Sequence, residues 1–316
     1  MKKTGRTKAV PKTTCPVCAS TETAFKYRIA RHGFDVFACA ACKSEFQHPF
    51  PKNADAFYDE GYYTGAAAFN YQDERKKEYY HAFVHRARLK SIRRFLNSDL
   101  SAFGTAGARF LDVGCAFGAL ARAAATAGFE VYGLDVSGYA VREGNKASET
   151  AGNPARLFQG DLTHLPRSQK KIFAPENFAA ITLIEVAEHL QTPRIDLATA
   201  FDLLKPGGVL VIQTANFEGL QAVAGGSDYH YYLPGHLIYY TATGLKRMLS
   251  EIGFREFQEF FPVDFSLWAK WRKAWGDIHR IGDITRLWKM SLYHLKSKLR
   301  RNGKPLTSSY VLYARK

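Results

Sequence analysis

The sequence has 316 residues, of which 46% are hydrophobic, enough for one sizeable α/β domain with smaller attachments. No apolar run reaches the ~18 residues of a membrane-spanning helix, and no apolar stretch follows the basic N-terminus as it would in a secretory signal. We therefore expect a cytoplasmic protein, with a peripheral position at the inner membrane face as a further option.

The net charge of +15 is concentrated at the two ends of the chain. Residues 1–12, predicted to be a basic flexible tail, contain five Lys or Arg and no acid. Residues 263–316 contain thirteen Lys or Arg against three Asp, so these two segments account for the whole net charge. An enzyme acting on RNA is expected to line its active-site face with phosphate contacts. The neutral middle of the chain counts against a nucleic-acid partner without excluding one.

Residues 13–48 contain two C-x-x-C pairs, formed by Cys15, Cys18, Cys39 and Cys42. Four thiolates at this spacing predict a closed tetrahedral zinc site of the structural type, with no open position for catalysis. The β-forming residues between the pairs fit the short hairpins of a zinc ribbon. A disulfide pair is the alternative, and a reducing cytoplasm argues against it.

Residues 49–104 are predicted to form a helical connector. The connector is rich in tyrosine, with Tyr58, Tyr62, Tyr63 and Tyr71. Such a stretch can pack in a core or lie over a ligand site as a lid, and both interpretations stay open.

Residues 110–135 have the pattern of a βαβ unit. The apolar run 110–113 predicts a buried strand, Gly114 and Gly118 a tight turn, and the Ala-rich stretch after them a helix. A second strand ends on Asp135. This arrangement binds nucleotides at the carboxyl ends of strands, where Asp135 would accept from ribose hydroxyls and the glycines would let the backbone approach the ligand.

The turn differs from a dinucleotide-binding turn, which reads G-x-G-x-x-G. Here the pattern is Asp112-x-Gly114-x-x-x-Gly118, and a carboxylate at Asp112 would repel a pyrophosphate but suits an ammonium group. S-adenosylmethionine joins adenosine to such a group. The motif resembles that of the class I SAM-dependent methyltransferases, (V/L)LD(V/I)GCGxG. Cys115 is a small residue in this turn, and Ala116 stands where the family often has glycine.

The resemblance covers residues 105–262 and the last strand, and it implies a Rossmann-like α/β sheet of seven strands in the order 3-2-1-4-5-7-6. The methyltransferase domain would comprise residues 105–316. In the family, the acid after the third strand, here Asp161, binds the adenine amino group, and the next residue, Leu162, lies against the ring. The remaining strands are predicted at residues 156–162, 178–186, 209–212, from 253 onward, and 310–313.

The fourth strand leads into E-x-x-E-H, formed by Glu185, Glu188 and His189. In the family this position faces the substrate side of the cofactor, so we assign Glu185 to the cofactor and Glu188 and His189 to catalysis. His189 is the candidate general base because the pKa of a free histidine lies near neutrality. Some quinone-pathway O-methyltransferases of similar sequence hold a divalent metal with this string, and that option stays open. His236, in a loop that resembles the substrate-side crossover, is a second base, a substrate contact or a structural histidine.

Residues 263–305 are predicted to be a basic amphipathic helical insertion between the sixth and seventh strands. It contains all four tryptophans of the chain: Trp268, Trp271, Trp275 and Trp288. The insertion either packs on the core as a solvated helix or offers a surface to an anionic partner, such as a membrane face, a lipid-linked glycan or the phosphates of a sugar nucleotide.

We therefore expect a SAM-dependent methyltransferase with an N-terminal zinc ribbon. Its acceptor would be a small molecule, a sugar nucleotide or a lipid-linked glycan, methylated on oxygen. The alternatives are an RNA methyltransferase that uses the zinc module to bind RNA, and a non-catalytic protein that binds SAM as a scaffold.

Overall fold

The structure is a computed structural model that describes residues 13–52, 57–64, 75–96, 108–278 and 283–316. The predicted basic tail at 1–12 lies outside the described residues. So does Tyr71 of the predicted connector. Within these ranges no helix is long and apolar enough to cross a membrane.

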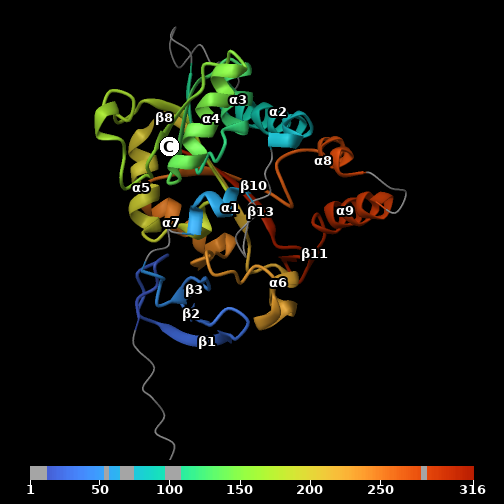
Figure 1. The fold of residues 1–316 in the computed structure, drawn as a ribbon. Coiled ribbons are helices and arrows are strands. Elements are labelled where there is room, and N and C mark those ends of the chain that lie inside the picture. The colour runs from blue at the N-terminus through green and yellow to red at the C-terminus, as the bar shows by residue number, and fades with distance from the viewer. Residues whose placement is uncertain (1–12, 53–56, 65–74, 97–107, 279–282) are drawn as a thin grey trace, which may run out of the picture.

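A seven-stranded sheet forms the centre of the molecule (Figure 1). Its strand order is β10-β13-β8-β7-β4-β5-β6, which is 3-2-1-4-5-7-6 read from the β6 edge, so the predicted order is confirmed. Six strands run in the same direction, and β13 is antiparallel to both of its neighbours. The strands are β4 (Arg109–Val113), β5 (Glu130–Asp135), β6 (Arg156–Gln159), β7 (Phe178–Ile184), β8 (Leu204–Ala215), β10 (Arg255–Phe260) and β13 (Ser309–Arg315).

Helices cover both faces of this sheet because side chains alternate along each buried strand. Phe110 packs with the helices on one face, whereas its neighbour Leu111 packs with those on the other. The first face carries α2 (Glu78–Phe95), α3 (Ala119–Thr126) and α4 (Gly138–Thr150), and the second carries α5 (Pro193–Leu203) and α7 (Ala242–Ile252). Two core clusters result, one on each side of the sheet.

The fifth strand of the sheet, β8, begins earlier than predicted. It starts at Leu204, directly after α5, instead of after the Pro206–Gly207 turn. The reason is a pairing with β7: Leu204 lies opposite Phe178, and the register shifts before Ala180 meets Val209. On the other side of β8, the Lys316 amide donates to the Gly208 carbonyl at 2.9 Å, and the Gly207 amide donates to the Lys316 carbonyl. The ladder between β8 and β13 therefore continues through the turn.

The N-terminal module is a small sheet that lies beneath the domain in Figure 1. Its strands are β1 (Thr23–Ile29), β2 (Phe34–Cys39), β3 (Glu45–His48) and β9 (Ile238–Tyr239), in that order. The fourth strand, β9, comes from the methyltransferase part of the sequence, almost two hundred residues after β3. Val17 and Phe46 share one core cluster with Leu245 and Met248 of α7, so the module packs directly on the second face of the domain.

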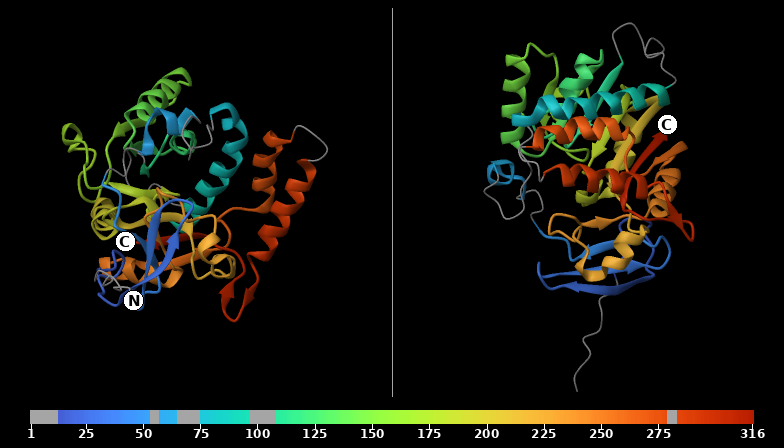
Figure 2. Two further views of the ribbon diagram at one scale, coloured as in Figure 1. Left: turned by 60° about the horizontal axis from the view of Figure 1, so that its bottom comes forward. Right: turned by 90° about the vertical axis from the view of Figure 1, so that its right-hand side faces the viewer.

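The segment after β10 forms two helices followed by a hairpin. The helices α8 (Leu267–Ala274) and α9 (Ile284–Lys296) stand at one side of the molecule, where α8 packs on α2 (Figure 2). The hairpin consists of β11 (Arg300–Arg301) and β12 (Lys304–Pro305). The short helices of the described residues are α1 (Glu60–Thr64), α6 (Leu220–Gly225) and the 3-10 turns Arg75–Lys77, Arg167–Gln169, Ala187–His189, Gly226–Asp228 and Trp275–Asp277.

Candidate active site

The loop between β4 and α3 turns sharply through left-handed backbone. Gly114 and Gly118 have φ of +68° and +75°, and Ala116 between them has φ of +47°. A Cβ atom on Gly114 would lie 2.3 Å from Cγ2 of Val186, closer than any real contact. Glycine is therefore required at 114 both by the backbone conformation and by the approach of the segment after β7.

Asp135 ties the end of β5 to this loop. Its carboxylate accepts from the backbone amides of Ala116 at 2.8 Å and Ser137 at 2.9 Å, and from the Tyr63 hydroxyl at 3.2 Å. Burial raises its pKa, against the effect of these three donors. Tyr63 belongs to α1, so this part of the predicted connector covers the carboxylate that we assigned to a ribose.

Asp112 lies within β4 and is 4% exposed. It accepts from the Thr182 hydroxyl at 2.7 Å. Burial raises its pKa to about 7, although the Thr182 hydrogen bond and the nearby charge of Arg88 act in the opposite direction. A buried carboxyl of this kind gains from the arrival of a cation, because a positive group favours its ionised form.

The other predicted cofactor residues differ in their surroundings. Cys115 is buried, and its sulfur lies 2.7 Å from the position that a Cβ on Gly133 would take. Asp161 accepts from the amides of Thr163 and His164; burial opposes its ionisation, but these hydrogen bonds and that of the His164 ring lower its pKa. Leu162 is only 2% exposed and packs in the core, so its contact with an adenine ring stays a prediction.

A cavity of about 490 Å³ opens beside the loop. Four of the predicted cofactor residues line it, namely Asp112, Gly114, Cys115 and Glu185. Other lining residues come from α2, α8, α9 and the segment before α8, and they include Arg88, Phe265, Lys270, Lys273 and Met290. Burial, and then Lys273, lowers the pKa of Lys270 to about 8. Neither lysine forms an ion pair within the part of the chain that the structure describes.

A polar network runs behind this cavity and was not predicted from the sequence. Arg88 of α2 forms an ion pair of 3.0 Å with Asp264, and its other contacts include Gln213 of β8. Gln213 in turn donates to Glu185 at 2.6 Å, and the Tyr231 hydroxyl also donates to Glu185. The network therefore connects the start of the insertion to E-x-x-E-H, through residues that are far apart in the sequence.

Within E-x-x-E-H, Glu188 is almost completely buried. It is 2% exposed, and neither carboxylate oxygen has a hydrogen-bond partner among the described residues. Burial, and then the charge of Glu185, holds its pKa well above the usual range. A buried carboxyl without a partner is costly, so this side chain is expected to meet a ligand group or an ion.

His189 and His236, both predicted site residues, lie together, with ring centroids 4.8 Å apart. Nδ1 of His189 lies 2.7 Å from the Gly235 carbonyl and 2.7 Å from the Tyr58 hydroxyl. Nδ1 of His236 lies 2.9 Å from the Tyr231 carbonyl. Because a carbonyl only accepts, both rings carry their proton on Nδ1, which leaves Nε2 with a lone pair.

The pKa values of both histidines are lowered, so both rings favour the neutral form. Burial lowers the pKa of His189, against the effect of the Gly235 carbonyl. Burial, and then the neighbouring His189, lowers the pKa of His236 to about 3. The ligand atoms of Glu188, His189 and His236 all lie within 4.8 Å of one another. These three residues form one compact group. The sequence motif had suggested Glu185 as its third member, and in the structure His236 takes that place.

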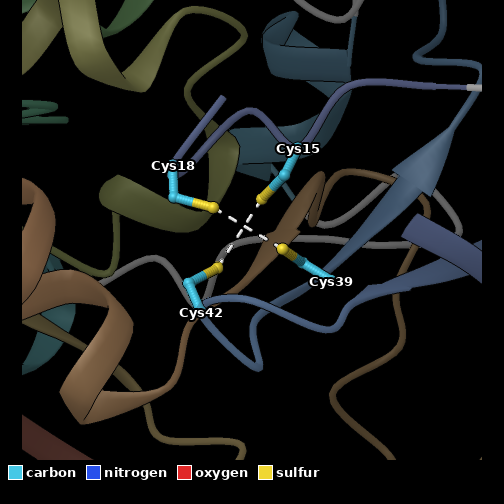
Figure 3. A group of neighbouring side chains, drawn as sticks. All are labelled: Cys15, Cys18, Cys39 and Cys42. Carbon is cyan, nitrogen blue, oxygen red and sulfur yellow. Dashed lines mark hydrogen bonds between the residues drawn. The ribbon is translucent and has the colours of Figure 1, made fainter. Parts of the chain in front are cut away.

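The four predicted zinc cysteines also come together (Figure 3). Their sulfurs lie within 4.8 Å of one another, with 3.6 Å between Cys15 and Cys42 and 3.5 Å between Cys18 and Cys39. These separations exceed a disulfide bond of about 2.0 Å and approach the roughly 3.8 Å edge of a tetrahedron with Zn–S distances of about 2.3 Å. All four are free thiols in the structure.

Comparison with known proteins agrees with this architecture. A family model described as "Methyltransferase domain" matches residues 80–259. The chain is 33% identical over 128 residues to a ubiquinone biosynthesis O-methyltransferase of Actinobacillus pleuropneumoniae serotype 7, covering 40% of this chain and 54% of that protein. It is 35% identical over 115 residues to the Psychrobacter arcticus protein of the same name, covering 36% and 43%. The chain thus spans about half the length of the curated relatives it matches.

Solved structures with a similar fold include a SAM-dependent methyltransferase from Archaeoglobus fulgidus, 16% identical with a TM-score of 0.46, covering 76% of this chain and 98% of that chain. Another is a geranyl diphosphate C-methyltransferase from Streptomyces coelicolor, 15% identical with a TM-score of 0.47, covering 77% and 85%.

Proposed function

Because this chain belongs to the methyltransferase-domain family, we propose that it transfers a methyl group from S-adenosylmethionine to an oxygen of a small-molecule acceptor. The observation that carries the proposal is the approach of Gly114, in the cofactor loop, to Val186, inside E-x-x-E-H. This approach sets the cofactor loop against the segment that holds the candidate base. The names of the relatives, ubiquinone biosynthesis O-methyltransferases, support a hydroxyl acceptor.

The residues around the loop fit S-adenosylmethionine. Gly114 lines the cavity of about 490 Å³, together with Asp112 and Cys115 of the same segment. The buried Asp112 carboxyl suits the ammonium group of the cofactor, and Asp135 suits the ribose hydroxyls, of which one would take the place now held by the Tyr63 hydroxyl. When bound, the cofactor supplies an activated methyl group on a sulfonium.

His189 is the residue that would accept the acceptor's proton. Its Nδ1–H is held by the Gly235 carbonyl, so the Nε2 lone pair is available and its orientation is fixed. Since burial lowers the pKa of His189, the neutral ring is favoured before the reaction. Nε2 of His189 would take the proton of the acceptor hydroxyl as that oxygen gains the methyl group, and S-adenosylhomocysteine would leave as the second product.

The test is a comparison of His189→Ala with the unchanged chain, using simple catechols and nucleotide sugars as two acceptor arms and release of S-adenosylhomocysteine as the readout. We expect kcat to fall by about 10²–10⁴-fold, with little change in cofactor affinity measured by calorimetry. Turnover only with nucleotide sugars would place the acceptor among glycans. Binding of the cofactor without turnover on any acceptor would favour the scaffold interpretation, and failure to bind it would refute the proposal.

A divalent metal at Glu188, His189 and His236 is a second candidate role for the same residues. The unpartnered Glu188 carboxylate and two histidines whose Nδ1 protons are held by backbone carbonyls form the arrangement that metal ligands require. In that case metal analysis should find one equivalent that Glu188→Gln removes and that mutation of Cys18 leaves in place. No such equivalent is expected if His189 acts as a base without metal.

We also infer that the four-cysteine cluster holds a structural Zn²⁺. The sulfur separations support a tetrahedral ion, and four thiolate ligands would leave no open coordination position. Because these cysteines belong to the same core cluster as α7, the ion would stabilise the contact between the N-terminal module and the domain as well as the module itself.

A further inference from the structure

The insertion helices carry an unusual concentration of exposed apolar side chains. Twelve large apolar side chains are exposed in the described residues, and seven of them lie in the insertion. Single exposed apolar residues are ordinary, but a group of this size on one element marks an interaction surface. The seven, called here the tryptophan face, are Trp268, Trp271, Trp275, Ile284, Trp288, Leu295 and Leu299.

Three exposed tryptophans share one side of α8 and of the 3-10 turn that directly follows it. Trp268, Trp271 and Trp275 follow i, i+3 and i+7 spacing and fall within an arc of about 60°. They are 64%, 44% and 61% exposed. The opposite side of α8 carries Lys270 and Lys273, which line the cavity.

On α9 three exposed apolar residues also share one side of the helix. Ile284, Trp288 and Leu295 fall within an arc of about 40°, well away from Leu287 and His294, which are buried. The two helices present one continuous face, because the Trp271 indole donates to the hydroxyl of Ser291 at 2.8 Å. Ser291 lies between Trp288 and Leu295 on this side of α9.

Basic side chains border the tryptophan face. Lys289 and Lys296 are exposed and lie roughly 100° around α9 from its apolar stripe. Neither forms an ion pair within the described ranges. The segment from 263 to the end of the sequence carries thirteen Lys or Arg against three Asp.

We propose that the tryptophan face docks on an anionic phospholipid bilayer. Tryptophan settles at the boundary between headgroups and acyl chains, and flanking lysines reach the phosphates, so the two features together match that boundary. A second copy of the chain would bring two strongly basic segments together, which is repulsive. RNA would engage the lysines but leave the apolar stripe exposed.

Docking would also place the cavity close to the membrane, because α8 has the tryptophan face on one side and cavity residues on the other. This link rests on the proposed function, and it implies an acceptor that is itself anchored in the bilayer. The docking does not depend on it, since binding to vesicles is measured without turnover.

The chain contains its own probe for the test, because all four of its tryptophans lie in the insertion. The full chain is titrated with vesicles of phosphatidylcholine alone or mixed with phosphatidylglycerol, and intrinsic fluorescence and co-flotation are recorded. We expect a blue shift and flotation with the anionic vesicles, both reduced by salt. Lys289→Gln with Lys296→Gln should weaken partitioning about 30-fold, at roughly fivefold per charge, whereas Lys170→Gln with Lys171→Gln should not.

Trp275→Ser with Trp288→Ser should also weaken flotation, while Trp268 and Trp271 still report the shift. The matched control is Ile195→Ser with Val223→Ser, which removes two side chains of similar exposure from other elements. Equal binding to both vesicle types, no binding to either, concentration-dependent dimerisation that the tryptophan variants abolish, or preferential retention on RNA would each overturn the proposal.

Discussion

Replacing Gly114 with alanine tests whether the cofactor loop is fixed by its contact with the segment after β7. At φ of +68° an alanine costs about 1–2 kcal/mol. Its Cβ would also lie 2.3 Å from Val186 Cγ2, and relieving such an overlap costs about 1–3 kcal/mol. Loss of chain entropy in the unfolded state returns about 0.4–1 kcal/mol. The free energy of unfolding should therefore fall by about 1–5 kcal/mol.

Gly33→Ala is the matched control, because Gly33 has φ of +76° with nothing within 4 Å of its Cβ position. It has the backbone cost without the overlap. Urea unfolding of both variants separates the backbone cost from the cost of the overlap. Adding Val186→Ala to Gly114→Ala should recover the stability lost to the overlap, with a coupling energy of about 0.5–3 kcal/mol between the two positions. Calorimetric titration with S-adenosylmethionine should show weaker binding for Gly114→Ala alone. If Gly114→Ala loses no more stability than Gly33→Ala, the reasoning about this contact is wrong.

Three further predictions concern buried groups. Asp264→Asn leaves the buried Arg88 without its counter-ion and should lower the free energy of unfolding by about 3–5 kcal/mol, whereas Glu256→Gln, in an exposed pair with Arg315, should cost at most about 1 kcal/mol in the same urea assay. Because burial raises the pKa of Asp112 to about 7, the native state keeps a proton there that the unfolded state releases above pH ~4, so the stability from this group is lost as the pH rises to about 7. Relative to the unchanged chain, Asp112→Asn should therefore gain stability between pH ~4 and about 7 and gain no more above that range. A stability difference that does not depend on pH would contradict this. Cys18→Ser should lose one zinc equivalent by metal analysis and melt at a lower temperature, while Cys115→Ser keeps the metal; retention of zinc by Cys18→Ser would refute the cluster as its site.

The parts of the molecule that were predicted correctly are those encoded by neighbouring residues. The turn from Asp112 to Gly118, the strand order it implied and the two C-x-x-C pairs each depend on spacing within a short segment. The connector was predicted only as core or lid, and α1 shows one of its tyrosines, Tyr63, bonded to Asp135.

The parts that were missed depend on contacts between distant residues. Arg88 and Asp264 are separated by 176 positions, and Tyr58 reaches His189 across 131. Neither contact can be predicted from neighbouring residues, because an exposed arginine or tyrosine would have the same surroundings in the sequence. The sequence also failed to show that His236, and not Glu185, lies beside Glu188 and His189. Glu185 has φ of +57° just after β7, and its carboxylate accepts hydrogen bonds from Gln213 and Tyr231, which are distant in the sequence.

The pairing of β3 with β9 has a consequence for synthesis of the chain on the ribosome. The N-terminal module is made early, but its fourth strand emerges only after residue 239. Until then β3 presents an open edge, and the apolar side chains that later meet α7 face water, a state that invites pairing with other nascent chains. A bound metal would hold the four cysteines and the hairpins together during this interval. The cysteine cluster would in this way protect the unfinished protein, and the module's last strand completes the fold only when the segment that follows His236 arrives.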